Sequence, residues 1–137
     1  MRMIDEDVAV VSRRTGSPPD VVYGFASRMD ELPSWASGLA RGIEQRAGEW
    51  FAMSPMGEVK VAMVPANPHG VLDHTVTLPD GTTVFNALRV TPCGSGSLLT
   101  FVVLRDRTAT RERFEADVAH VERDLATLAD LVDRTGR

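Results

Sequence analysis

Alternating apolar and polar positions predict that the middle of the chain, residues 39–106, forms an antiparallel β-sheet. Apolar side chains recur there at every second residue, which is the period of a strand with one buried face. The stretch 98–104 is apolar on both faces, as is typical of a strand near the centre of a sheet. A Val-rich run at 7–14 predicts one further strand ahead of this region.

Two short helices are expected between the first strand and the sheet region. In SPPDVVYGFASRM (17–29), Ser17 is the expected N-cap, and Pro18 and Pro19 suit the first turn. Apolar residues four positions apart give this helix one buried stripe. LPSW (32–35) predicts a second and shorter helix.

The C-terminal segment predicts one long helix, because its apolar residues recur at alternating steps of four and three. A helix of about 25 residues, roughly 38 Å long, accommodates all of them. The apolar stripe consists of Phe114, Val118, Val121, Leu125, Leu128 and Val132.

Two turn sequences determine the expected strand register. SPMG (54–57) predicts a type I turn followed by a left-handed glycine bulge. Counting outward from this turn gives the expected pairs on the inner, apolar face, which are Met53–Val59 and Phe51–Val61. The outer face is then expected to hold Trp50, Ala52, Lys60 and Ala62.

The turn LPDG (78–81) carries the same signals and predicts a second hairpin. Counting outward from it gives the pairs Leu78–Thr82, Val76–Val84 and Leu72–Leu88 on the apolar face. The opposite face carries threonines and charged residues, so it is expected to be the wetter side of the sheet.

Asp73 and His74 are neighbours in the sequence but are expected to point to opposite faces of their strand. The register places His74 on the apolar face, directly across from Asn86 and within reach of a side-chain hydrogen bond. Asp73 lies on the wetter face, diagonal to Arg89, where a solvated ion pair is expected. His74 and Asn86 allow two interpretations: a neutral polar pair satisfied within a core, or polar groups that orient a ligand or move a proton in a cavity.

Composition narrows the class of protein. A chain of 137 residues with 43% hydrophobic and 25% charged residues fits one globular domain over 1–137. A net charge of −4 without a basic cluster argues against nucleic-acid binding. The one cysteine, Cys93, fits a reducing compartment, the acidic N-terminus does not resemble a signal peptide, and no apolar run approaches the roughly 20 residues of a membrane span. We therefore expect a cytoplasmic protein.

The three histidines, His69, His74 and His120, share no metal-ligand spacing. His120 is expected on the polar side of the last helix. We therefore expect neither a metal site nor a cofactor.

The order of the elements and five stretches of sequence resemble the helix-grip fold of the START-like (SRPBCC) superfamily, and within it the polyketide cyclase/dehydrase-like proteins. The stretches cover almost the whole chain and are 17–39, 48–61, 70–76, 89–101 and 113–132. The resemblance implies an α+β fold in which a curved antiparallel sheet wraps around the long C-terminal helix, with two short helices after the first strand. A cone-shaped nuclear-transport-factor-like domain is the alternative fold, but that fold usually opens with helices.

Members of the superfamily commonly hold a hydrophobic small molecule between the sheet and the long helix, and they include lipid and hormone binders, cyclases and partner-binding co-chaperones. The superfamily has no universal catalytic signature, so the resemblance implies a cavity and assigns no catalytic residue. Trp35 is either a cap over the entrance of the cavity or a structural residue. The candidate ligand-binding residues are Trp35, Phe51, Met53, Val61, Met63, Leu72, His74, Val76, Asn86, Leu88, Val121 and Leu125.

Three functions are compatible with these observations. The favoured one is binding of a small hydrophobic molecule, such as a lipid, polyketide or aromatic compound. The second is a cyclase- or dehydratase-like enzyme, with His74 as general acid/base and Asn86 polarising a carbonyl. The third is a protein-interaction module that uses the outer sheet face near Trp50 and Lys60, where Trp50 marks either a homodimer contact or a residue covered by a neighbouring strand.

Overall fold

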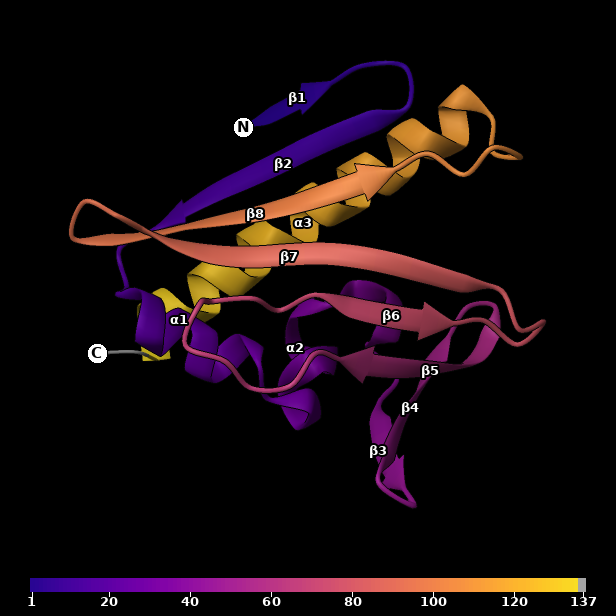
Figure 1. Ribbon diagram of the computed structural model, residues 1–137, viewed down its shortest axis with the longest axis horizontal. Helices are drawn as coiled ribbons and strands as arrows, with labels where there is room; N and C mark the ends of the chain where they lie inside the picture. Colours follow the sequence, from indigo (N-terminus) through magenta and orange to yellow (C-terminus); the bar gives the residue numbers. More distant parts are fainter. Residues whose placement is uncertain (136–137) are drawn as a thin grey trace.

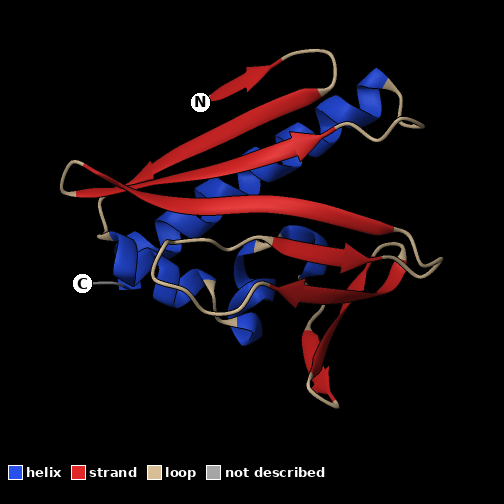
Figure 2. Cartoon of the chain, in the orientation of Figure 1, coloured by secondary structure: helices blue, strands red, loops and turns tan. Residues whose placement is uncertain are grey.

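The structure is a computed structural model that describes residues 1–135, and it consists of one antiparallel sheet with helices on one of its faces (Figure 1; Figure 2). The strands lie in the order β1-β2-β8-β7-β6-β5-β4-β3. The strands are β1 (Arg2–Ile4), β2 (Val8–Thr15), β3 (Ile43–Arg46), β4 (Glu49–Ser54), β5 (Gly57–Met63), β6 (His74–Thr77), β7 (Thr83–Cys93) and β8 (Gly96–Leu104). The helical elements are α1 (Pro19–Ala26), η1 (Met29–Glu31), α2 (Leu32–Trp35), η2 (Ser37–Leu39) and α3 (Arg111–Thr135). This is a helix-grip fold, so the predicted fold class is confirmed.

The long helix α3 crosses the inner face of the sheet behind β2, β8 and β7 (Figure 1). The predicted apolar stripe is the face by which it packs, because five of its six members are at most 1% exposed. Val121 is the exception and is half-buried. The helix begins after Thr110, whose Oγ1 accepts a hydrogen bond from the N–H of Arg113 at 3.1 Å.

The entrance to α1 differs from the expectation, because Ser17 is not its N-cap. Pro18 occupies that position and makes no side-chain cap. The hydroxyl of Ser17 instead donates to Oδ1 of Asp133 at 2.8 Å, and the Ser17 carbonyl accepts from the hydroxyl of Ser97 at 2.7 Å. Ser17 therefore ties α3 and β8 to the start of α1, and these long-range bonds outcompete a local cap.

The β7–β8 turn passes so close to the end of β2 that only glycine fits at position 96. A Cβ on Gly96 would overlap the carbonyl oxygen of Thr15. The turn itself consists of two residues, because Cys93 pairs with Gly96.

The β4–β5 hairpin is shifted by one residue from its predicted register. Ser54 pairs directly with Gly57, so the loop contains only Pro55 and Met56, and Gly57 adopts φ +111°. A shift of one residue moves every side chain to the other face of a strand. The observed inner-face pairs are Ala52–Val59 and Trp50–Val61, whereas Phe51 and Met53 lie on the outer face with Lys60 and Glu58.

The β6–β7 hairpin has the predicted register. Val76 pairs with Val84 and His74 with Asn86, while the N–H of Leu72 donates to the carbonyl of Leu88 at 2.8 Å. The observed register therefore supports the prediction that Asp73 and His74 point to opposite faces of the sheet.

Candidate functional site

Two adjoining hollows lie between the inner face of the sheet and the N-terminal half of α3, and we call them together the inner hollow. The first, about 570 Å³, is bounded by β7, β8 and α3, and its walls include Asn86 and Val121. The second, about 540 Å³, is bounded by the β4–β5 turn, β6, η2 and α3, and its walls include Val76. Both are lined by Asp117 and His120, so they meet at these two residues of α3.

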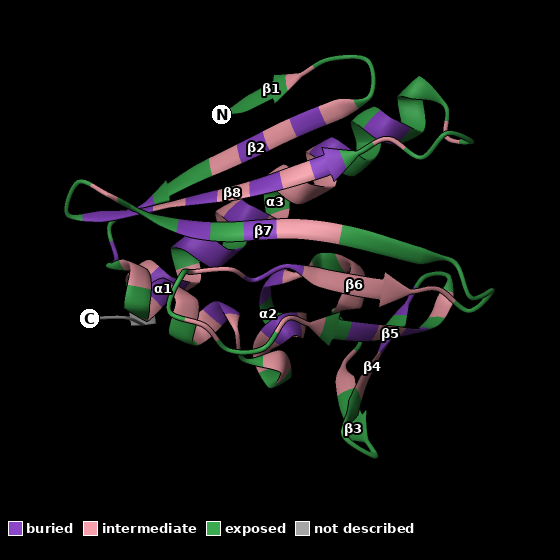
Figure 3. Cartoon of the chain, in the orientation of Figure 1, coloured by how far each residue is buried: buried purple, intermediate pink, exposed green. Residues whose placement is uncertain are grey.

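The inner hollow occupies only one end of the space between sheet and helix. At the other end, Leu72 and Leu88 are completely buried and fill the interior. Exposure increases toward the N-terminal end of β7 (Figure 3), where Val84 points to the inner face and is still 42% exposed. The sheet and α3 therefore diverge there and leave apolar wall residues uncovered.

Apart from His74, the candidate residues predicted from sequence divide into four groups. Val76, Asn86 and Val121 line the inner hollow. Trp35, Leu72, Leu88 and Leu125 are at most 4% exposed and belong to the closed core. Val61 and Met63 line a separate hollow, and Phe51 and Met53 lie on the outer face, where Met53 is 43% exposed. His74 is the remaining candidate.

Trp35 is a core residue of α2 and not a lid over the inner hollow. It is 4% exposed, and its Nε1 has no hydrogen-bond partner within residues 1–135. The structural interpretation of Trp35 therefore fits the observed position better than the capping one.

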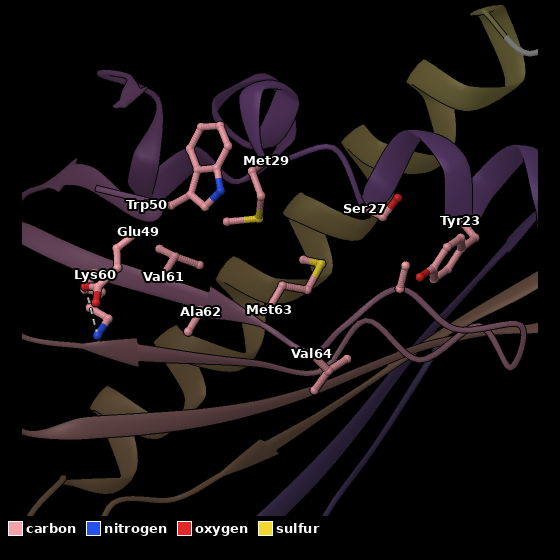
Figure 4. A pocket seen from close by; sticks show the side chains of 12 residues that line it. Tyr23, Ser27, Met29, Glu49, Trp50, Lys60, Val61, Ala62, Met63 and Val64 are labelled. Carbon is pink, nitrogen blue, oxygen red and sulfur yellow. Dashed lines mark ion pairs between the residues drawn. The ribbon is translucent and has the colours of Figure 1, made fainter. Parts of the chain in front are cut away.

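The separate hollow, about 430 Å³, lies where strands β4 and β5 meet α1 and η1. In Figure 4 the side chains of Trp50, Met29 and Met63 face one space, while Lys60 turns away to pair with Glu49 at 3.1 Å. The expectation that Trp50 shares the outer face with Lys60 is therefore wrong, because the shifted register places Trp50 opposite Val61.

His74 and Asn86 face each other as predicted, but the hydrogen bonds found in residues 1–135 do not join their side chains. Nδ1 of His74 contacts the carbonyl oxygen of Leu72 at 3.0 Å, which assigns the Nδ1–H tautomer. The amide of Asn86 donates to the carbonyl of Val84 at 3.3 Å. The His74 ring packs edge-on against Phe101, with ring centroids 6.2 Å apart. Asn86 thus lines the hollow, whereas His74 lines neither part of it.

Burial lowers the pKa of His74 below its ordinary value of about 6.5. The hydrogen bond to the Leu72 carbonyl and the nearby charge of Asp73 oppose this effect without overcoming it. His74 is therefore a neutral imidazole at pH 7.

The predicted ion pair between Asp73 and Arg89 is present. Its carboxylate is buried, whereas the sequence predicts a solvated pair. Asp73 is only 5% exposed, and its Oδ2 lies 2.8 Å from Nη2 of Arg89. Its Oδ1 also accepts a hydrogen bond from the N–H of Leu88 at 3.1 Å. The carboxylate is buried because it replaces a backbone acceptor of the ladder, which no pattern of alternating residues reveals.

A polar cluster that the sequence analysis missed lies at the meeting point of the two hollows. Nε2 of His120 lies 3.2 Å from Oδ2 of Asp124, and the hydroxyl of Ser37 donates to the other carboxylate oxygen at 2.7 Å. The same hydroxyl lies 3.3 Å from Nε2 of His120. Because the Ser37 proton is given to Asp124, Ser37 acts as acceptor toward His120, and both contacts favour a proton on Nε2. Nδ1 of His120 is thereby left to face other partners.

A signal for this cluster exists in the helix pattern. Asp117, His120 and Asp124 follow one another at steps of three and four residues, so they form a polar stripe beside the apolar stripe of α3. Ser37, however, is 83 residues from His120. The contact between η2 and α3 that makes His120 part of a site could not be foreseen from the helix alone.

Two further observations concern metals and membranes. Across residues 1–135, no three His, Cys, Asp or Glu side chains are grouped so that they could hold a metal ion. The helices in the same range include none that is both long and apolar enough for a membrane crossing.

Comparisons with known proteins show the fold. No family model matches the chain, and no curated protein matches it. XoxI from Bacillus cereus has a similar structure, with a TM-score of 0.72, 12% identity, and coverage of 93% of this chain and 96% of that chain. Ara h 8.0201 has a TM-score of 0.62 at 12% identity, covering 91% and 96% of the two chains. DynU16, from the dynemicin biosynthetic locus, has a TM-score of 0.72 at 13% identity, covering 97% of this chain and 49% of that chain.

Proposed function

We propose that this protein binds a small, mostly hydrophobic molecule in the inner hollow. The observation that carries the proposal is the divergence of the sheet from α3, which leaves apolar wall residues uncovered around a space of ligand size. Pockets for small ligands usually measure about 300–1,000 Å³ and combine apolar walls with a few polar groups. The inner hollow has this character, because Val76 and Val121 form its walls and Asn86 and His120 add polar groups.

The fold supports the same proposal. We assign the chain, as one domain over 1–137, to the START-like superfamily near its polyketide cyclase/dehydrase-like branch, and we place it in the cytoplasm. Its structural neighbour DynU16 comes from a biosynthetic locus, a setting in which small organic molecules are made. Binding without catalysis is favoured over the cyclase-like alternative, because His74 lines neither part of the hollow.

Thermal unfolding with a panel of decanol, 1-naphthol and comparable compounds tests the proposal. A ligand present at a hundredfold excess over its Kd stabilises a folded protein by about 2.7 kcal/mol. We expect at least one compound to raise the Tm of the wild type. Val121→Phe fills the first part of the hollow and Val76→Phe fills the second, so the double variant should abolish this rise.

Val10→Phe is the matched control. Val10 lies on β2, paired with Val102, and lines none of the hollows described above. This variant should respond to ligand as the wild type does. A flat Tm across the panel, or a rise that the double variant Val121→Phe/Val76→Phe retains, would contradict the proposal.

A further inference from the structure

The second part of the inner hollow joins an apolar wall to a group of basic side chains. On the sheet side its lining is apolar and includes Val59, Val76 and Leu78. On the α3 side it is lined by Arg113, His120 and Arg123, with Asp117 as the one carboxylate in the lining. A molecule that fills this space therefore meets an apolar surface at one end and a cationic one at the other.

The two arginines on the α3 side differ in their ion pairing. Nε of Arg113 lies 3.2 Å from Oδ1 of Asp117, so this pair is close to neutral. The guanidinium of Arg123, by contrast, pairs with no carboxylate within residues 1–135. One guanidinium without a carboxylate partner in this range therefore lies at the edge of the hollow.

His120 is oriented by a fixed partner. Asp124, whose side chain is 14% exposed, and the hydroxyl of Ser37 both hold Nε2, and η2 covers that edge of the ring. A carboxylate bound to one nitrogen of a histidine fixes the orientation of the ring. Because Nε2 is engaged, Nδ1 is the nitrogen left for a ligand in the hollow, and it donates to an anion when the ring is an imidazolium.

We propose that the ligand of the inner hollow is a hydrophobic carboxylic acid, whose carboxylate is held by His120 and Arg123 while its apolar body lies against β5 and β6. This inference rests on the proposed function and names the chemical class of the ligand. Two separated donors suit a carboxylate, which has two acceptor oxygens. Asp124 and Ser37 are positioning residues, since they act only through His120.

Calorimetric titration with matched acids and amides tests the inference. The probes are decanoate against decanamide and 2-naphthoate against 2-naphthamide, so each pair shares one apolar body. We expect the wild type to bind at least one acid about tenfold more tightly than its amide, as one charge-assisted hydrogen bond provides. In His120→Gln and Arg123→Gln the affinity for the acid should fall by about the same factor, and the affinity for the amide should change much less.

Arg111→Gln is the matched control. Arg111 lies on the same helix, pairs with Glu115 at 3.2 Å and lines neither part of the hollow. This variant should keep the preference for the acid. Loss of the preference in this variant, or its persistence in both His120→Gln and Arg123→Gln, would overturn the inference.

The two proposals fail in different ways. If acids and amides bind equally well to the wild type, the ligand class is wrong and hydrophobic binding stands. If no probe of either kind binds and the neutral panel also leaves the Tm flat, both proposals are wrong.

Discussion

The carboxylate of Asp73 accepts a hydrogen bond from the backbone N–H of Leu88 at 3.1 Å, inside the sheet and shielded from water. In a regular antiparallel ladder this N–H would donate to the carbonyl of Leu72, which lies directly opposite. That carbonyl is instead contacted by Nδ1 of His74 at 3.0 Å. The two neighbouring side chains therefore exchange one ladder hydrogen bond for two side-chain bonds. Asp73 and His74 never meet, yet they act on the same break in the ladder.

Replacing Asp73 tests how much this break depends on its carboxylate. Asp73→Ala leaves the buried N–H of Leu88 without an acceptor, and we expect a loss of about 2 kcal/mol in the free energy of unfolding. Asp73→Asn keeps an oxygen acceptor but loses the charge, so its loss should be about half as large. Urea denaturation of the variants measures both values.

Arg89→Gln separates the ladder bond from the ion pair. The side chain of Arg89 is 55% exposed, so its charge contributes little to stability. We expect the order of destabilisation to be Asp73→Ala, then Asp73→Asn, then Arg89→Gln. If Arg89→Gln destabilised the protein as much as Asp73→Ala, the ion pair and not the ladder bond would be the main contribution.

The depressed pKa of His74 predicts a loss of stability in acid. In the unfolded chain this histidine binds a proton near pH 6.5, whereas in the folded chain burial delays protonation to lower pH. Between these two pKa values the unfolded state holds more protons, so the free energy of unfolding decreases as the pH falls below about 6.5. Above that pH the contribution of His74 is constant.

Urea denaturation between pH 5 and 7.5 measures this dependence. His74→Gln removes the titrating group and should flatten the decrease in acid. His69→Gln is the control, because His69 is exposed. Equal slopes in the wild type and His74→Gln would show that other groups cause the acid sensitivity.

The two hairpin turns explain why one register could be predicted and the other could not. Both turns have proline in second and glycine in fourth place, so the sequence signals are the same. At the β6–β7 turn the carboxylate of Asp80 accepts from the N–H of Thr82 at 2.9 Å and supports the longer loop. At the β4–β5 turn the hydroxyl of Ser54 accepts from the N–H of Met56 at 3.2 Å and donates to the carbonyl of Gly57 at 2.8 Å, which closes the shorter loop. Side-chain bonds to the turn backbone therefore decided the loop length.

The candidate site was predictable only where it depends on local pattern. The apolar faces of β6 and α3 placed Val76 and Val121 at the hollow, because strand and helix periods are properties of a short segment. His120 was assigned to the polar side of its helix, although it lies where the two hollows meet. Its role depends on Ser37 and η2, which reach it through tertiary packing that no periodicity encodes.

The register of the β4–β5 hairpin determines which side chains of β4 are buried, and two substitutions test it. In the observed register Ala52 is 2% exposed and Met53 is 43% exposed. Ala52→Asp should therefore bury an unpaired charge and cost several kcal/mol, enough to prevent folding. Met53→Asp should change the free energy of unfolding by less than about 0.5 kcal/mol, as surface substitutions usually do. The register expected from the sequence reverses this order, so urea denaturation and circular dichroism of the two variants distinguish the two registers directly.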